Sequence, residues 1–244
     1  MNQLQLSQFQ WAVRRGHIED CRGWIKCGAD VNFVDENGRS PLNYAVAWNE
    51  NWEGGRTGTQ PEVVKFLLEN GAHPEIEFRQ SPLLSAAYRK CAESVALLLE
   101  AGADEDALTE YDQSALHLAL MIPQTGGCHS GKQRLETVRH LLEYAADPNQ
   151  SDDLGWTPLG LAIRDCRGRD VMAIKMLFRA GAELATHDQR PQRTSQNAAA
   201  WAVFDQIERA GGWMECARKH KRVLAGLVAK CVPLPDEAAR VVVA

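Results

Sequence analysis

The sequence lacks several features that would assign it to a common class of protein. No apolar run approaches the roughly 20 residues that a membrane-spanning helix needs. Residues 1–10 are polar and do not show the basic-then-apolar order of a secretory signal peptide. The formal net charge of −5 gives no support to a general nucleic-acid binder. We therefore expect a cytoplasmic or nuclear chain whose partner is neither a membrane nor a nucleic acid.

Cysteine frameworks and catalytic motifs are missing as well. The 7 cysteines are odd in number and scattered without a Cys-x-x-Cys pair, which favours reduced thiols over disulfides. There is no Gly-x-Ser-x-Gly, His-Glu-x-x-His or paired-carboxylate arrangement. Gly126-Gly-Cys-His-Ser-Gly-Lys132 has the spacing of a phosphate-binding loop, but Gln133 follows it where Ser or Thr would hold Mg²⁺. The sequence predicts a chain that is not an enzyme and binds no cofactor or metal.

What the sequence does contain is repetition. Glu93-Ser-Val-Ala-Leu-Leu-Leu-Glu-Ala-Gly-Ala-Asp104 predicts a short amphipathic helix that Gly102 ends in the left-handed conformation. The phrase returns at 62–73 and 136–147, and more loosely at 18–30 and 171–183. Recurrence at a roughly fixed spacing predicts a repeat architecture.

A second recurring phrase precedes the first. Ser40-Pro-Leu-Asn-Tyr-Ala45 and Thr157-Pro-Leu-Gly-Leu-Ala162 share one frame with the segments that begin at Ser81 and Ser114. Ser or Thr is expected to cap a helix, and Pro, where present, occupies its first position. Each such helix is followed by the helix of the first phrase, so the unit of repetition is a helix pair.

The two linked phrases resemble the ankyrin repeat, whose pattern is Thr-Pro-Leu-His-x-Ala with a period of about 33 residues. The resemblance covers roughly residues 7–196 and implies an all-α solenoid. Its helix–turn–helix pairs carry β-turn fingers, with about five recognisable repeats plus degenerate helical caps. We expect a repeat array at 1–211 and a C-terminal capping helix and tail at 212–244. The repeats are expected near 5–34, 35–75, 76–108, 109–151, 152–190 and, in degenerate form, 191–211.

Departures from the regular pattern have their own implications. The spacing between repeats is stretched by extra residues at 49–60, 123–133 and 165–169, which are polar and Gly-rich and therefore predicted to be loops between paired helices. His117 matches the His of the family pattern, which implies a hydrogen bond between neighbouring repeats. Asn43, Leu84 and Gly160 replace it elsewhere, and we expect that bond to be missing there.

The resemblance also implies where a partner binds, since ankyrin proteins usually use the finger tips and the exposed end of each first helix. Large aromatics and Arg at positions that burial does not demand are typical of interface hot spots. Arg14 and Arg15 extend this row in the first repeat. The residues expected to bind a protein or peptide partner are Arg39, Trp48, Phe78, Tyr88, Arg89, Tyr111, Met121, Trp156 and Arg164. The interpretation is a monomeric, non-catalytic interaction module, although some of these side chains could instead fold back onto neighbouring repeats.

The C-terminal segment supports an alternative function. Leu234-Pro-Asp-Glu237 is similar to the start of an F-box, and Pro233-Leu-Pro235 is similar to the end of a SOCS box. The tail at 231–244 could therefore make the chain a substrate-recognition adaptor of a ubiquitin ligase. The basic run Arg218-Lys-His-Lys-Arg222 could be a nuclear address or bind nucleic acid, or it could complement the dipole of the last helix.

Two further features leave alternatives open. Asp104-Glu-Asp106, with Glu110 and Asp112, makes one finger acidic, which suits a basic partner segment or a solvated loop. Asn32 and Asn149 resemble the asparagines that oxygenases hydroxylate in ankyrin proteins, which would make the chain a substrate of such an enzyme.

Overall fold

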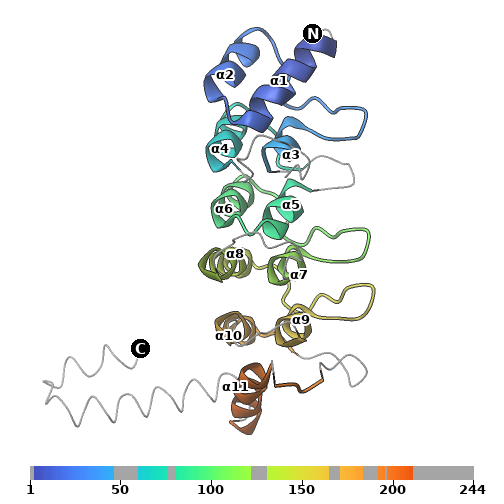
Figure 1. Cartoon of the computed structure of the whole chain (residues 1–244), viewed down its shortest axis with the longest axis vertical. Helices are drawn as coiled ribbons and strands as arrows, with labels where there is room; N and C mark the ends of the chain where they lie inside the picture. Colours follow the sequence, from blue (N-terminus) through green and yellow to red (C-terminus); the bar gives the residue numbers. More distant parts are fainter. Residues whose placement is uncertain are drawn as a thin grey trace, which may run out of the picture.

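The computed structural model describes residues 3–46, 60–75, 81–121, 131–164, 171–183, 192–195 and 197–210. Within these ranges five helix pairs stack along one direction, and a further helix crosses the end of the stack (Figure 1). The β-structure found in these ranges is an isolated bridge between Leu108 and Ser114. The all-α repeat architecture predicted from the sequence is thereby confirmed. No helix in this part of the chain has the length and apolar character needed to cross a bilayer.

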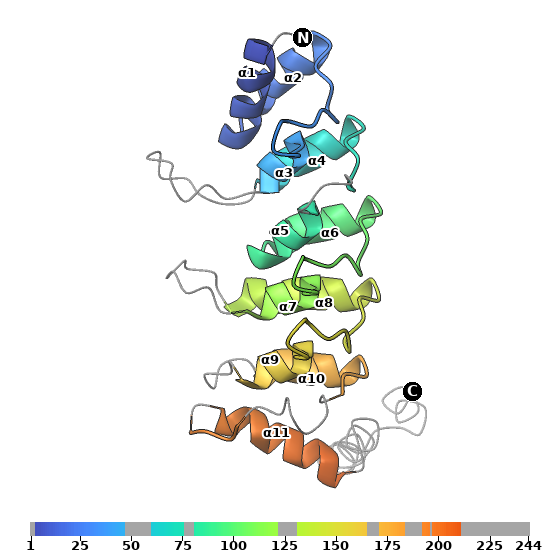
Figure 2. The ribbon, with the colours of Figure 1, turned by 90° about the vertical axis from the view of Figure 1, so that its right-hand side faces the viewer.

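The first helices of the pairs form an inner layer and the second helices form an outer layer (Figures 1 and 2). The inner helices are α1 Gln3–Arg15, α3 Pro41–Val46, α5 Pro82–Tyr88, α7 Ala115–Leu120 and α9 Pro158–Arg164. The outer helices are α2 Ile18–Lys26, α4 Pro61–Glu69, α6 Ala92–Glu100, α8 Gly131–Glu143 and α10 Val171–Arg179. Each inner helix packs on the next inner helix and each outer helix on the next outer one. Each repeat is therefore stabilised mainly by its contacts with the repeats directly before and after it.

Side chains cap the inner helices as the sequence predicts. The Ser81 hydroxyl accepts the backbone N–H two residues later at 3.2 Å. Ser114 and His117 form a reciprocal cap, in which the Ser114 N–H donates to His117 Nδ1 at 3.2 Å. Ser40 and Asn43 reproduce that cap, with the Ser40 N–H donating to Asn43 Oδ1 at 3.0 Å and the Asn43 N–H to Ser40 Oγ at 3.1 Å. These bonds satisfy donors that a helix N-terminus leaves unpaired.

The outer helices end at residues in the left-handed region. Gly28, Gly71, Gly102 and Gly181 have φ between 85° and 90°, which a residue without Cβ adopts without steric cost. In the fourth repeat Ala145 takes this place with φ 65°, at a cost of about 1 kcal/mol. The glycine stop predicted from the recurring phrase is confirmed.

One continuous hydrophobic core runs through the array. The Leu of each Ser/Thr-x-Leu phrase is fully buried: Leu42, Leu83, Leu116 and Leu159. At the far end α11, Ala198–Arg209, contributes Trp201 and Phe204 to the same core. The rings of Phe178 and Phe204 lie 5.8 Å apart, so α11 covers the end of α10.

Asparagine side chains link the turns of neighbouring repeats. The Asn32 amide donates to the Gly71 carbonyl at 2.9 Å, and the Asn149 amide donates to the Gly181 carbonyl at 3.1 Å. In both cases Oδ1 also accepts a backbone N–H two residues further on, at 2.7 Å. The two interfaces therefore carry the same two-bond bridge. Hydroxylation of these asparagines stays a prediction.

Carboxylates occupy the equivalent positions between those bridges. Glu75 accepts the Asp104 N–H at 3.1 Å, and Asp106 accepts the Asp147 N–H at 3.1 Å. Burial raises the pKa of Glu75, the Asp104 N–H opposes this, and the Asp104 charge adds to the increase. A carboxylate cannot donate to the carbonyl that the Asn amide reaches, so these two interfaces rely more on packing.

The stretched spacings differ partly from expectation. Residues 131–133 were expected to belong to a loop, but they form the first turn of α8, in which Thr137 Oγ1 donates to the Gln133 carbonyl at 2.9 Å. Lys132 and Glu136 also pair across one helical turn at 4.0 Å, which favours helix there. The remaining expected loops, apart from Gln60 before α4, lie outside the described residues, as does 212–244. The domain boundaries therefore stay predictions.

Candidate interaction surface

Each described finger is a tight turn organised by its first side chain. Asp35 Oδ1 accepts backbone N–H groups two and four residues later at 2.9 and 2.8 Å. Asp152 Oδ1 does the same at 3.1 and 2.7 Å, and Thr109 Oγ1 at 3.3 and 3.1 Å. Adjacent fingers are also joined, because the Asp153 N–H donates to the Tyr111 carbonyl at 3.1 Å. The finger tips are thus held in place before any partner arrives.

The side of the array that carries the fingers and the inner helices is here called the inner face (Figure 2). On its finger tips Tyr111 is 56% exposed and Leu154 is 64% exposed. Arg39 is exposed on the first finger. The exposed Tyr and Leu at neighbouring tips provide apolar surface that is not buried in the folded chain and can contact a partner.

The ends of the inner helices hold most of the other predicted residues. Tyr88 ends α5 and is 40% exposed, Arg89 follows it, and Arg164 ends α9. Met121 follows α7 but packs against the core, so it offers less surface than its sequence position indicated. Its thioether is unbranched and flexible, which lets it turn inward. Trp48 and Phe78 lie outside the described residues.

Arginine side chains stack on aromatic rings along the inner face. The guanidinium of Arg89 lies 5.3 Å from the Tyr88 ring centre, and that of Arg164 lies 5.1 Å from the Trp156 ring centre. A cation at this distance over a ring is attracted by the electron-rich face of the ring. Two of the aromatics predicted for binding therefore serve also as supports for predicted arginines.

Sequence reasoning missed two aromatic supports at the start of the array. Arg14 lies 5.5 Å from the Tyr44 ring centre in the next repeat, and Arg15 lies 5.3 Å from the Trp11 ring centre. Trp11 and Arg15 are four residues apart on one helix, a spacing that could have revealed the contact. The pairing of Arg14 with Tyr44 crosses a repeat boundary and has no local signal.

The Trp156 ring packs closely over Gly160 of α9, so a side chain at that position would require the ring to shift by a few tenths of an ångström. A Cβ at that position would lie 3.2 Å from Trp156 Cε3. The backbone of Trp156 is fixed as well, because its carbonyl bonds His117 Nε2 at 2.9 Å. This confirms the inter-repeat bond predicted for His117, whose pKa is lowered by burial and raised in part by that bond and by Asp152.

Tyr44 and Asp35 tie the first finger to α3. The Tyr44 hydroxyl donates a short hydrogen bond to Asp35 Oδ2. Burial and the neighbouring carboxylate raise the pKa of Tyr44 to about 12. Burial raises the pKa of Asp35, but the bonds from Tyr44 and from the finger N–H groups outweigh it and lower the pKa. Asp35 is therefore a structural anion within the finger.

Lys90 is an unexpected feature beside the predicted Arg89. It is 2% exposed and adopts φ 56° in the turn between α5 and α6, where the first repeat has Gly16 with φ 76°. Its Nζ donates to the Tyr88 carbonyl at 3.2 Å. Burial first, and then the charges of Arg134 and Arg89, lower the pKa of Lys90 to about 8. A cationic cluster therefore lies at the end of α5.

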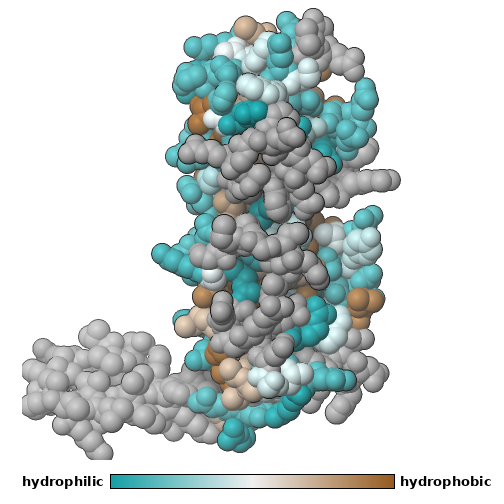
Figure 3. All heavy atoms as spheres, viewed as in Figure 1, coloured by the Kyte–Doolittle hydropathy of each residue, from teal (hydrophilic) through white to brown (hydrophobic). Residues whose placement is uncertain are grey.

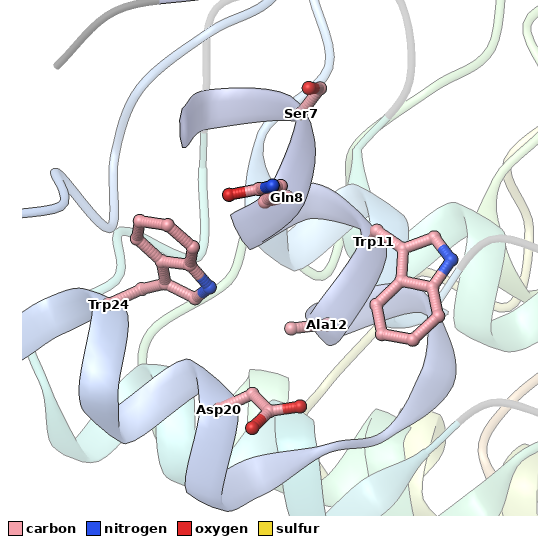
Figure 4. Close-up of a pocket in the computed structure, with 6 residues that line it drawn as sticks. All are labelled: Ser7, Gln8, Trp11, Ala12, Asp20 and Trp24. Atoms are coloured by element: carbon pink, nitrogen blue, oxygen red, sulfur yellow. The ribbon is translucent and has the colours of Figure 1, made fainter. Parts of the chain in front are cut away.

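A cleft of about 670 Å³ opens at the start of the array (Figure 4). Trp11 and Trp24 lie on its opposite sides, with Ala12 and Asp20 between them. Asp20 pairs with His17 Nδ1 at 3.1 Å, so its carboxylate is already engaged. The described residues that line this cleft belong to α1 and α2, apart from the later fingers.

The described surface is mostly hydrophilic in the view of Figure 3, and its apolar residues form small separate groups. Within the described ranges no three His, Cys, Asp or Glu residues are grouped so that they could hold a metal ion. The surface is thus one of scattered apolar anchors between charged groups, which is typical of a transient protein interface.

The fold and this surface define a class: helical repeat solenoids that present a preformed face built from fingers and inner helices. An ankyrin repeat family model matches residues 37–77 and 111–153. The chain therefore contains ankyrin repeats, and its helix pairs are similar to those of ankyrin repeat proteins. Ankyrin repeats are protein-interaction units, which supports an interaction module.

Curated relatives agree with this assignment. The chain is 24% identical over 236 residues to E3 ubiquitin-protein ligase KEG of Arabidopsis thaliana, covering 80% of this chain and 14% of that protein. It is 34% identical over 66 residues to myotrophin of Xenopus tropicalis, covering 27% and 48%. It is 32% identical over 115 residues to cyclin-dependent kinase inhibitor 2A of Monodelphis domestica, covering 47% and 59%. The chain therefore spans less than two thirds of the length of each of these proteins.

Proposed function

We propose that the chain is a non-catalytic interaction module that holds a protein or peptide partner on its inner face. The observation that carries the proposal is the exposure of Tyr88 and Tyr111 on that face, at 40% and 56%. Both rings stand on elements fixed by capped helices and hydrogen-bonded fingers. Preorganised aromatic side chains bind without a large ordering cost, and Tyr is enriched in binding hot spots.

The neighbouring residues support the same role. Arg164, stacked on Trp156, and Arg39 on the first finger supply charged contacts around the apolar anchors. The expected partner is one polypeptide segment that reaches several repeats, bound by a monomeric array in the cytoplasm or nucleus. Trp48 and Phe78 belong to the proposed surface by their sequence positions.

The test compares matched tyrosine variants. The double variant Tyr88→Ala with Tyr111→Ala should lose at least tenfold in affinity for partners selected on the full chain, while far-ultraviolet circular dichroism and melting stay unchanged. Tyr144→Ala is the control, because Tyr144 is 38% exposed beyond the end of the outer helix α8. Equal affinity of the double variant and the control for the partner would show that the binding site does not lie on the inner face.

The ligase-adaptor alternative depends on the tail at 231–244, which lies outside the described residues. The relative named as an E3 ubiquitin-protein ligase matches over only 14% of its length, so the similarity says little about recruitment. Co-purification of a cullin complex with the full chain, lost on deletion of 231–244, would support the adaptor function. Co-purification of the cullin complex that persists after this deletion would rule out the tail as the recruiting segment.

A further inference from the structure

Two neighbouring fingers, at residues 104–114 and 147–157, are described without a gap, and we call them the acidic finger pair. Their tips carry Leu154 and Tyr111, the two most exposed large apolar side chains of the described residues. The tips are adjacent, because the Asp153 N–H donates to the Tyr111 carbonyl at 3.1 Å. The finger pair therefore holds an apolar surface that nothing in the described part of the chain covers.

The same two fingers are acidic. The first contains five Asp or Glu residues and the second contains three, and neither contains Lys, Arg or His. Some of these carboxylates serve the fold, as Asp152 does by accepting finger N–H groups. The side chains of Glu110, Asp112 and Asp153 are exposed and have no hydrogen bond or ion pair within the described ranges. These three charges are therefore available to a partner.

We propose that the acidic finger pair binds a basic polypeptide segment in which an apolar side chain is flanked by Lys or Arg. Glu110 and Asp112 directly flank Tyr111 in the chain. Asp153 directly precedes Leu154. The apolar side chain would pack on the two exposed anchors while cations reach the carboxylates around them, which a guanidinium can contact in two-pronged geometry. The inference rests on the proposed function, because it names the chemistry of the partner at one part of the inner face.

The adjacency of the tips sets the form of the segment. Backbones joined by a hydrogen bond across two strands lie about 5 Å apart, so one apolar side chain can contact both Tyr111 and Leu154. In an extended chain, residues two apart lie roughly 7 Å from each other and point to the same side. Cations two residues before and two residues after the apolar anchor would therefore face the carboxylates. The expected pattern is basic, any residue, apolar, any residue, basic.

Other occupants fit the finger pair less well. Nucleic acids and anionic membranes carry negative charge, which the exposed carboxylates would repel. A basic segment that lacked an apolar side chain would leave Leu154 and Tyr111 in water. An apolar segment without cations would approach Glu110 and Asp153 without compensating their charge. The combination of apolar anchors and carboxylates thus selects a partner with both kinds of group.

A peptide selection on two forms of the full chain tests the proposal. A random peptide display library is enriched on the natural chain and depleted on Leu154→Ser, so that the recovered peptides depend on the Leu154 side chain. They should contain about twice the Lys and Arg of the unselected library, and their affinity should fall as salt rises. Loss of the buried Leu side chain should weaken their binding to Leu154→Ser about tenfold.

Two double variants that remove two carboxylates each separate local contacts from net charge. Glu110→Gln with Asp153→Asn should weaken binding of a selected, labelled peptide roughly fivefold, the effect expected for two exposed ion pairs. Glu62→Gln with Glu69→Gln is the matched control, because both residues are exposed on the outer helix α4. The control should leave the affinity unchanged. Unchanged thermal melting of both double variants would show that the fold is retained.

The outcomes separate this inference from the proposed function. Selected peptides without an excess of Lys or Arg that still lose binding to the Tyr88→Ala, Tyr111→Ala double variant would overturn the inference and leave the proposed function standing. Equal weakening by the two carboxylate double variants would also overturn it, because net charge would then attract the peptide. Self-association of the natural chain that Leu154→Ser abolishes would make the occupant a second copy. Peptides indifferent to every inner-face variant would refute the proposed function itself.

Discussion

Lys90 places an amine in a buried turn, and its charge should therefore destabilise the folded chain. The change from the ordinary pKa of 10.5 to about 8 corresponds to a penalty of about 3 kcal/mol on the folded state at neutral pH. Lys90→Met keeps the apolar stem and removes the charge, so it should raise the free energy of unfolding by up to that amount. Lys90→Gly further relieves the left-handed backbone strain of about 1 kcal/mol, although glycine's greater freedom in the unfolded chain offsets much of this.

The pH dependence of the free energy of unfolding shows whether the stability gained by Lys90→Met comes from removing the charge. A base with a lowered pKa binds fewer protons when folded, so the stability of the natural chain rises between about pH 8 and pH 10.5. The stability gained by Lys90→Met should therefore be full at pH 7 and about half as large near pH 9.5. Urea denaturation at both pH values measures this, with Lys65→Met on the exposed side of α4 as the control. A gain that is the same at both pH values, or no gain, would refute the assignment of a buried cation.

Two other substitutions test the bonds between repeats. Asn149→Ala should lower the free energy of unfolding by about 1–3 kcal/mol in urea denaturation, since it removes both bonds to the next turn, and Asn149→Asp should lose less. An effect below about 0.5 kcal/mol would show that the bridge adds little to packing. His117→Asn should keep the cap to Ser114, as Asn43 does with Ser40, and lose the bond to Trp156. Because burial lowers the pKa of His117, the natural chain should lose stability as the pH falls below about 6.5. The melting temperature of His117→Asn should fall less than that of the natural chain over the same pH range.

Much of the fold was readable because each local signal agreed with the others. Ser81 and Ser114 cap helices, Gly102 ends one, and the buried leucines recur in the same frame. The failures have local causes. Residues 131–133 looked like a loop because of their glycine and polar character, but the ion pair and hydrogen bond of the following helix extend it over them. Repeat periodicity does not report how far a helix continues toward its N-terminus.

The candidate surface was predictable only in outline. Position in the repeat located Tyr88, Tyr111 and Arg164, because the repeat places those positions on one side. It could not show that Met121 turns inward or that a buried lysine occupies the glycine position after α5. Contacts across a repeat boundary, such as Arg14 on Tyr44, depend on how two helices stack. No spacing within one sequence segment carries that information.

The alternation of asparagine and carboxylate along the turns has a consequence for how the array comes apart. In a linear stack the strength of each interface decides how many repeats unfold as one cooperative unit. Asn32 and Asn149 join their neighbours by two bonds each, whereas Glu75 and Asp106 supply one. The two interfaces of the third repeat have fewer of these bonds, but they include the most extensive packing between helices of neighbouring repeats, that of α5 on α7 and of α6 on α8. Hydrogen bonds and packing therefore offset one another along the described part of the array, which evens out the strength of its interfaces and favours unfolding as one cooperative unit.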